Sequence, residues 1–208
     1  MFFLISGAAA SGKSTMARLL KEQLHNVECH DYDERTAATA FDRCRILEDE
    51  WIREALAAQS EGKDFLLSTH SPLGELLAAP SAVCLDGISC CLLDCHDFER
   101  VRRYRGRPGL EDWPLTQGTL SWASWMRLHA SDPQWEQHVI VNSSQPGFEW
   151  KRWTNWAGGD KRWRIGIIDS TDRAKEETLA LLLDWIIRVK DKESALSAKT
   201  RWWSEDNR

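Results

Sequence analysis

Short apolar runs alternate with amphipathic stretches along most of this chain. Runs of strand length and composition predict five β-strands, over residues 1–6, 27–30, 64–68, 88–94 and 163–169. Apolar positions at helical spacing predict helices over 14–24, 42–58, 97–106 and 172–190, the last capped by Asp172. Ser71-Pro72 predicts the start of a short helix that ends near Ala79. Alternating strands and helices indicate an α/β fold with a five-stranded parallel sheet that is flanked by helices.

Residues 107–160 break this pattern, between the fourth and fifth predicted strands. Eight of the twelve Trp residues lie between Trp113 and Trp163. One helix is predicted over 119–130, with Trp122, Trp125 and His129 on one face. We therefore expect a single domain over 1–190 that contains an insertion at 107–160. A polar tail over 191–208, apolar only at Trp202-Trp203, is expected to be partly disordered.

Length, net charge and cysteine spacing indicate which classes of protein the chain can belong to. A length of 208 residues suits one domain, and a net charge of −5 gives no attraction of the whole protein to nucleic acid. No apolar run reaches the roughly 20 residues of a membrane span, and the first run is too short for a signal peptide. We expect no membrane partner and a cytoplasmic location. None of the six Cys residues forms a C-x-x-C pair, so the cysteines in apolar stretches (Cys84, Cys90 and Cys91) are predicted to be small buried residues.

The motif that carries most chemistry follows the first predicted strand. Residues 7–14 read GAAASGKS and fit the phosphate-loop pattern G-x-x-x-x-G-K-[ST]. Strand, loop and helix together form a cradle of backbone N–H groups for phosphate oxygens. Lys13 is predicted to reach the β- and γ-phosphates of ATP, and the Ser14 hydroxyl to bind Mg²⁺. The predicted nucleotide-binding residues are Gly7, Ala10, Ser11, Gly12, Lys13, Ser14 and Thr15.

Acidic side chains follow the second predicted strand. Asp31 and Asp33 are separated by one residue, which on an extended chain points both the same way. Asp33 is the candidate general base and Asp31 the candidate metal ligand, although the two roles are interchangeable and a solvated turn is the alternative. The same two carboxylates, together with Arg35 and His70, are the candidate substrate-binding residues; a structural role for His70 is equally compatible with the sequence.

Five arginines lie within eight residues after the fourth predicted strand, at positions 100, 102, 103, 105 and 107. Guanidinium groups stabilise the charge that develops during phosphoryl transfer. On a helix, Arg100, Arg103 and Arg107 share one side. We take Arg103 and Arg107 as the candidate catalytic arginines, and a solvated basic face as the alternative.

Aromatic and cationic residues interleave from Trp150 to Arg164. Two interpretations remain open. The rings stack nucleic-acid bases beside a cationic groove, or they form a small core with the cations at its rim.

The phosphate loop, the Asp-x-Asp pair after the second strand and the arginine-rich helix after the fourth together resemble small phosphate-loop kinases. The pattern is most similar to the shikimate, gluconate and adenylyl-sulfate kinase group, over residues 1–107 and 163–190. The resemblance implies an ATP- and Mg²⁺-dependent kinase that phosphorylates a hydroxyl group of a small molecule, with a mobile lid after the fourth strand. From the position of 107–160 between the fourth and fifth strands, we expect this segment to be the lid and its aromatic rings to contact the acceptor. Two alternatives stay open: a 5′-hydroxyl polynucleotide kinase, which Asp31, Asp33 and Arg35 also resemble, and a nucleotide-binding regulatory ATPase.

Overall fold

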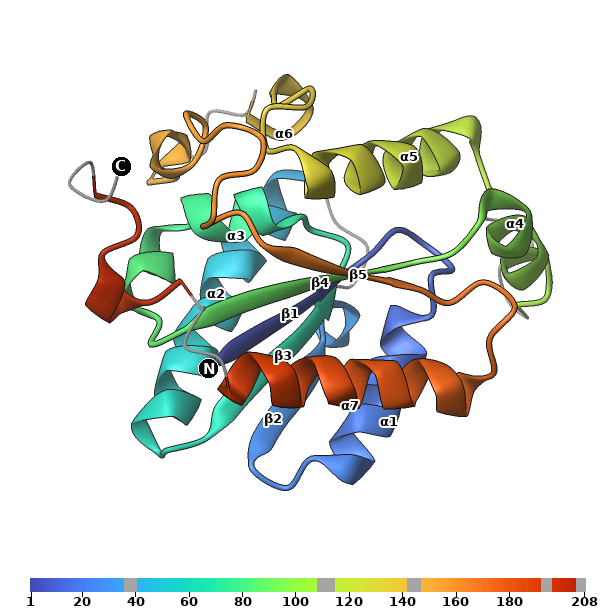
Figure 1. Ribbon diagram of the computed structural model, residues 1–208, viewed down its shortest axis with the longest axis horizontal. Helices are drawn as coiled ribbons and strands as arrows, with labels where there is room; N and C mark the ends of the chain where they lie inside the picture. The colour runs from blue at the N-terminus through green and yellow to red at the C-terminus, as the bar shows by residue number, and fades with distance from the viewer. Residues whose placement is uncertain (36–40, 108–114, 142–146, 192–195, 205–208) are drawn as a thin grey trace.

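The protein is built on a five-stranded parallel sheet with the order β2-β3-β1-β4-β5 (Figure 1). The computed structural model describes residues 1–35, 41–107, 115–141, 147–191 and 196–204, with backbone alone for 41–47 and 191. The strands are β1 (Phe2–Ser6), β2 (Val27–Asp31), β3 (Asp64–Thr69), β4 (Ile88–Asp94) and β5 (Ile165–Asp169). The predicted α/β fold and its five parallel strands are confirmed.

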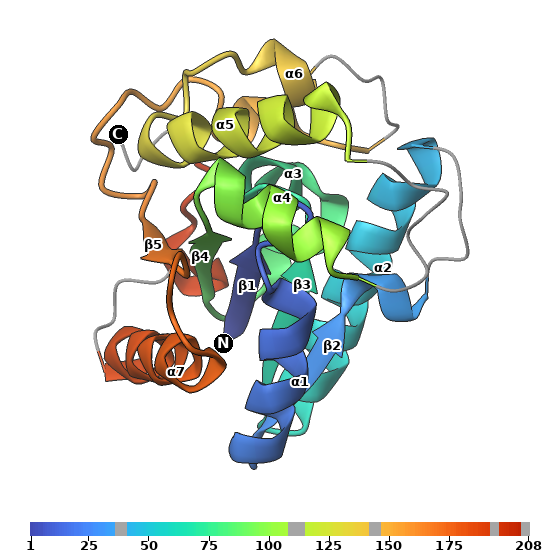
Figure 2. The same ribbon diagram turned by 90° about the vertical axis from the view of Figure 1, so that its right-hand side faces the viewer.

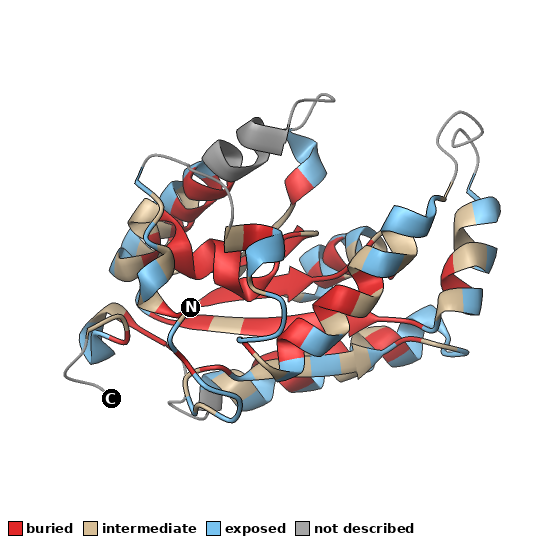
Figure 3. Ribbon diagram, turned by 90° about the horizontal axis from the view of Figure 1, so that it is seen from above, coloured by how far each residue is buried: buried red, intermediate tan, exposed pale blue. Residues whose placement is uncertain are grey.

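The sequence of β1 explains its central place. All five of its residues are buried, and four of them are apolar. Phe2 aligns with Phe65 of β3 on one side and with Ile88 of β4 on the other. A strand that is covered on both faces reads as a continuous apolar run, as this one does. The carboxyl end of β1 therefore lies in the middle of the sheet, the usual place of a ligand site in an open parallel sheet. Figure 3 shows the strands at the centre of the molecule mostly in red, the colour of buried residues.

Helices cover both faces of the sheet (Figure 2). One face is covered by α1 (Lys13–Gln23) and α7 (Lys175–Asp191), and the other by α2 (Phe41–Ser60), α3 (Leu73–Ala78) and α5 (Gln117–Ser131). Side chains alternate across β1: Phe3 and Ile5 pack toward α1 and α7, whereas Phe2 and Leu4 pack toward the opposite face. The helix α4 (Asp97–Arg105) follows β4, and α6 (His138–Val141) follows α5. Short 3₁₀ turns cover Tyr32–Glu34, Pro80–Cys84, Trp150–Arg152 and Ala198–Thr200.

The tryptophans near the end of the insertion form part of the main core. Trp153, Trp156 and Trp163 are 0, 1 and 7% exposed. Trp153 packs so closely on α3 that a Cβ added to Gly74 would lie 2.6 Å from its Cζ2 atom. Of the two interpretations of this segment, these three rings support the core, because a buried ring has no free face for a base. Trp113 lies outside the described residues.

The C-terminal segment is more ordered than the sequence predicts. Leu196 pairs with Ile88 at the start of β4, and Trp202 is 1% exposed against Trp156, with ring centroids 6.0 Å apart. Residues 196–204 of the predicted polar tail therefore belong to the folded structure, and partial disorder of the tail stays a prediction. Burial of the Trp202 ring contributes the apolar area that offsets the entropy lost by ordering its polar neighbours. Residues 192–195 and 205–208 lie outside the described residues.

Two helix starts also differ from prediction. In α3 the cap position is taken by Pro72, one residue later than predicted, with no side-chain cap hydrogen bond. Asp172 does not cap α7, which begins at Lys175; Asp172 has a φ of 52°, and this left-handed conformation belongs to the loop after β5. Cys84 is exposed rather than buried, because it ends a 3₁₀ turn at the surface. No helix of the described residues is long and apolar enough to cross a membrane.

His129 of α5 makes the aromatic core sensitive to acid. Its ring is 1% exposed and stacks on Trp125, with centroids 4.5 Å apart. Burial lowers the pKa of His129 to about 4. An unfolded histidine binds a proton near pH 6.5, whereas the folded one does not until about pH 4, so the folded state loses stability as the pH falls through this window.

We expect the free energy of unfolding to fall by about 2 kcal/mol more between pH 7 and pH 5 in the wild type than in His129→Phe, which cannot titrate there. Urea unfolding at the two pH values measures this difference. Equal losses in both proteins would contradict the assignment to His129.

Candidate nucleotide-binding site

The phosphate loop joins the carboxyl end of β1 to the start of α1. Gly7 is required there, because an added Cβ would lie 2.5 Å from the Leu93 carbonyl oxygen of β4. Gly12, the last residue before the helix, has a φ of 100°, which side chains rarely adopt. The two fixed glycines of the motif therefore have separate tasks: close packing on β4 at Gly7 and the turn into α1 at Gly12.

Backbone geometry in this loop suits an anion. Ala10 and Gly12 have positive φ values of 62° and 100°, whereas Ser11 between them does not. Alternation of this kind turns successive N–H groups to one side and forms a nest for negative charge. The first turn of α1 contains no acidic side chain, and its N–H groups lack intrahelical partners. The cradle predicted from the sequence is thus present in the backbone.

Ala10 occupies a conformation that favours glycine. Because it is a non-glycine residue at a φ of 62°, its replacement should relieve strain. We expect Ala10→Gly to raise the free energy of unfolding by about 0.5–1 kcal/mol. Ala8→Gly is the matched control, since Ala8 is buried in the same loop without a positive φ, and it should lose stability. Thermal unfolding of both variants tests this, and a destabilised Ala10→Gly variant would refute it.

Lys13 lies at the meeting point of the predicted site residues. Burial is the largest effect on its amine and lowers the pKa below its ordinary value. The charges of Asp33 and Asp31 act in the opposite direction, and those of Arg107 and Arg100 add to the lowering. Two predicted acids and one predicted arginine, distant in sequence, therefore lie close enough to Lys13 to act on it.

The acidic pair has a different local geometry from the one predicted. β2 ends at Asp31, and Asp33 lies in the following 3₁₀ turn, so strand alternation does not orient the two carboxylates. Instead, the Asp31 carboxylate caps this turn: it accepts hydrogen bonds from the Asp33 N–H at 3.1 Å and from the Ser68 hydroxyl at 3.2 Å. Asp31 is thereby fixed in position, whereas Asp33 is exposed.

His70 and Arg35 differ in their neighbours: His70 lies near Lys13, whereas Arg35 contacts α2. His70 is half-buried, and its ring meets that of Tyr32 edge to face at 5.3 Å. Burial, followed by the charge of Lys13, lowers the pKa of His70 below its ordinary value, so the imidazole is neutral at pH 7. Arg35 pairs with Glu54 and lies over the Trp51 ring at 4.2 Å. His70 thus belongs to the Lys13 site, whereas Arg35 is engaged with α2; a substrate contact for Arg35 stays a prediction.

Arg100 and Arg103 of α4 face the phosphate loop, as their helical spacing predicts, and Arg107 follows the helix, which ends at Arg105. Arg100 is fully buried and donates to the Ala9 carbonyl at 2.5 Å. Arg103 donates to the Ser11 carbonyl at 3.2 Å and to the hydroxyl and carbonyl of Ser170, which follows β5. Both side chains brace the outside of the loop. Arg107 is exposed and acts electrostatically on Lys13, so it is the better placed of the two candidate catalytic arginines to reach a nucleotide.

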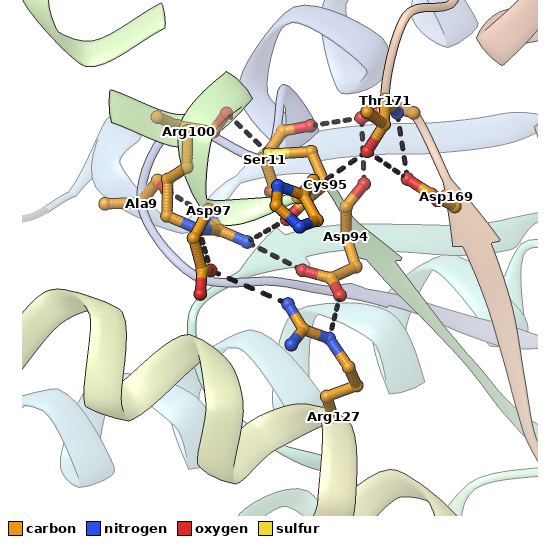
Figure 4. A network of polar contacts seen from close by, with 12 residues as sticks. Ala9, Ser11, Asp94, Cys95, Asp97, Arg100, Arg127, Asp169 and Thr171 are labelled. Carbon is orange, nitrogen blue, oxygen red and sulfur yellow. Dashed lines mark hydrogen bonds and ion pairs between the residues drawn. The ribbon is translucent and has the colours of Figure 1, made fainter. Parts of the chain in front are cut away.

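The sequence analysis missed the acid that organises these arginines. Asp94, at the end of β4, accepts hydrogen bonds from Arg100 and from Arg127 of α5, both at 2.6 Å (Figure 4). Two arginines neutralise this carboxylate, so it is a structural anchor rather than a metal ligand. It connects the loop, through Arg100, to the first long helix of the insertion. The available signal was a charged residue that closes an otherwise apolar strand.

The cations of the Trp/Arg segment lie away from this site. Arg152 donates to the carbonyl groups of Leu77 and Ala79 at the end of α3. Arg162 pairs with Asp160 at 2.8 Å and covers the Trp156 ring at 4.3 Å. Neither arginine is arranged along the phosphate loop as part of one continuous groove.

Comparisons with known proteins identify the fold. No protein-family model and no curated protein matches the sequence. Among solved structures, an unliganded sugar kinase from Janibacter sp. is similar with a TM-score of 0.56 and 12% identity, over 91% of this chain and 96% of the other. A thymidylate kinase from Candida albicans has a TM-score of 0.53 and 14% identity, over 94% and 96% of the two chains. The chain therefore has the fold of two solved kinases, with a phosphate loop at the carboxyl end of its central strand.

Proposed function

We propose that the protein is an ATP-dependent kinase that transfers the γ-phosphate to a hydroxyl group of a small molecule. The observation that carries this proposal is the position of Lys13. It extends from the phosphate loop into the field of Asp31, Asp33 and Arg107, with His70 beside it. A phosphate-binding cation, candidate bases and an additional cation are what phosphoryl transfer requires.

The nucleotide would bind in the backbone cradle from Gly7 to Thr15. Lys13 would neutralise charge on the β- and γ-phosphates, and Arg107 would add positive charge on the open side. Arg103 and Arg100 would hold the loop in place from outside through the Ser11 and Ala9 carbonyl groups. A rigid loop places its N–H groups before the charge develops, which lowers the reorganisation needed in the reaction.

The residues near the phosphate loop suit a Mg²⁺ ion that is held jointly by the protein and the phosphates of a nucleotide. No group of three or more His, Cys, Asp or Glu side chains in the described chain could hold a metal ion by itself. This agrees with the way proteins bind Mg²⁺ beside a nucleotide, through one or two side chains and the phosphates. Ser14 and Asp31 would be those side chains. The ion would neutralise phosphate charge during transfer.

Asp33 would take the proton of the acceptor hydroxyl as its oxygen bonds to the γ-phosphorus, and ADP would leave. An exposed carboxylate can accept a proton and pass it to water after the product departs. His70 is neutral and half-buried, so it can orient an acceptor by a hydrogen bond without adding charge. The acceptor would therefore lie between the turn after β2 and the end of β3.

A small acceptor is favoured over a polynucleotide. Trp153, Trp156 and Trp163 are buried and cannot stack bases, and the protein carries a net charge of −5. We propose further that the protein is a kinase of the shikimate, gluconate and adenylyl-sulfate type and that it is cytoplasmic. Residues 107–160 stay a predicted lid, but one without these three rings as acceptor walls. The polynucleotide kinase and the regulatory ATPase remain the alternatives that the assay separates.

An ADP-release assay tests the proposal. Purified protein with ATP and Mg²⁺ is combined with a panel of hydroxylated acids, sugars and nucleosides, and separately with a 5′-hydroxyl oligonucleotide. We expect acceptor-dependent ADP release and a phosphate monoester product with at least one small molecule. Product from the oligonucleotide alone would establish the polynucleotide kinase, and acceptor-independent hydrolysis would establish an ATPase.

A further inference from the structure

A second polar pocket lies among the cations that the proposed kinase site leaves unused. Its volume is about 280 Å³. The lining side chains come from the 3₁₀ turn near the end of the insertion, from the residues that flank this turn and from the C-terminal segment. They are Glu149, Lys151, Arg152, Asn155, Trp156, Arg162, Trp203 and Ser204.

Arg152 is the fixed cation of this pocket. Its Nη1 atom donates to the Leu77 carbonyl at 3.1 Å and to the Ala79 carbonyl at 2.6 Å. Burial lowers the pKa of this guanidinium below its ordinary value, and the charge of Glu149 opposes that effect. Within the described part of the chain, no carboxylate forms an ion pair with Arg152. The hydrogen bonds of this half-buried guanidinium go to neutral carbonyls and Glu149 acts on it without forming an ion pair, so an anion can add to the balance of its charge.

The other lining residues add charge and an apolar wall. Lys151 is exposed and forms no ion pair with the described residues. Arg162 is already paired with Asp160, so it adds little net charge, but its guanidinium covers the Trp156 ring. Trp203 is half-buried and meets the fully buried Trp202 edge to face at 5.6 Å. Two cations that form no ion pair with the described residues, Lys151 and Arg152, therefore line the pocket together with the half-buried Trp203 ring and the exposed carboxylate of Glu149.

This pocket is distinct from the phosphate loop. The C-terminal segment that lines it is attached to the start of β4, where Ile88 pairs with Leu196 and the Leu85 carbonyl accepts from the Ala198 N–H. The phosphate loop packs on the opposite end of β4, beside Leu93. β4 has seven residues, so its two ends lie about 20 Å apart. In Figure 1 the red C-terminal segment and α4 are correspondingly on opposite sides of the molecule.

We propose that this pocket binds a phosphate monoester carried on a planar ring, separately from the nucleotide in the phosphate loop. Nη1 of Arg152 is occupied by the Leu77 and Ala79 carbonyls, so the Nε and Nη2 edge of its planar fork would meet two phosphate oxygens, and Lys151 supplies a second, mobile charge. The ring of the ligand packs on Trp203. Arg152 and Lys151 bring two positive charges to the lining and the Glu149 carboxylate offsets one of them, so the pocket still favours an anion.

Isothermal titration calorimetry with phenyl phosphate tests this site in the full chain, with and without a saturating non-hydrolysable ATP analogue and Mg²⁺. We expect saturable binding with the same affinity in both conditions, and none with phenol, which lacks the phosphate. Lys151→Gln should weaken binding about tenfold, and Arg152→Lys, which keeps the charge but loses the fork, by a similar factor. Lys161→Gln is the matched control, because Lys161 belongs to the same segment but does not line the pocket.

Lys151 is exposed, so Lys151→Gln should not affect folding and still tests the site if Arg152→Lys loses stability. Thermal unfolding of both variants measures their stability. Affinity should also fall steeply with added salt, since both charges are partly open to solvent. Displacement of phenyl phosphate by the ATP analogue would place binding in the phosphate loop and overturn the proposal. Absence of binding, or equal affinity in wild type, Lys151→Gln and Arg152→Lys, would overturn it as well.

Discussion

Lys13→Ala should lower kcat of the proposed kinase by about three orders of magnitude or more. The Lys13 amine is the one cation that extends from the phosphate loop itself. Without it, the phosphate charge that develops in the transition state loses its nearest counter-charge. Burial, the largest effect, lowers the pKa of this amine although Asp33 and Asp31 oppose it, so a bound phosphate would stabilise the charge further. Steady-state ADP release with the best acceptor of the panel measures the effect.

Lys21→Ala is the matched control for this variant. Lys21 is an exposed lysine in the last turn of the same helix, α1, far from the loop. It should leave kcat unchanged and report any general effect of removing a lysine from α1. If Lys13→Ala retained wild-type turnover and ATP affinity, the loop would not be the nucleotide site.

Asp33→Asn should lower kcat by roughly 10²–10⁴-fold, the usual contribution of a general base. The amide keeps the size of the carboxylate and cannot accept the hydroxyl proton. ATP affinity should change little, because the cradle is formed by backbone groups of another segment. A pre-steady-state comparison of nucleotide binding with turnover separates these two quantities.

Asp31→Asn distinguishes the two acids. Asp31 is fixed by the Asp33 N–H and the Ser68 hydroxyl, so we expect its variant to raise the Mg²⁺ concentration required for activity more than it lowers kcat at saturating Mg²⁺. Asp86→Asn serves as control, since Asp86 is an exposed acid at the turn before β4, at the far end of the sheet. Wild-type rates in both Asp33→Asn and Asp31→Asn would reduce the pair to a structural turn.

Local patterns were sufficient to predict the sheet and the loop. Strands such as β1 are continuous apolar runs because both of their faces are covered, and this signal is present in the sequence itself. Gly7 and Gly12 identify the loop because the motif depends on what only glycine allows. A Cβ at Gly7 would lie 2.5 Å from the Leu93 carbonyl oxygen, and Gly12 has a φ of 100°. The acids after β2 were predicted from position alone, since all carboxyl ends of a parallel sheet meet at one edge.

Contacts between distant segments were the part that sequence patterns could not supply. Trp153 is buried because Gly74 of α3 leaves room for its ring, and nothing near either residue in the sequence indicates the pairing. Asp94 carries no motif, yet it is held by arginines from two helices, Arg100 and Arg127. The C-terminal segment has a polar composition, which predicts disorder, while the buried Trp202 ring and the pairing of Leu196 with Ile88 anchor it.

The position of β1 also has a consequence during synthesis. Among the five strands β1 is made before the others, yet its neighbours in the sheet are Asp64–Thr69 and Ile88–Asp94, so both of its edges wait for much later segments. At ordinary ribosome speeds the second partner follows after roughly 5–20 s. Throughout that interval the nascent chain carries an unpaired apolar strand, which is the type of segment that aggregates or recruits holding chaperones. Slower growth at lower temperature, with chaperones in excess, should therefore raise the yield of folded protein more than any change at the C-terminal end.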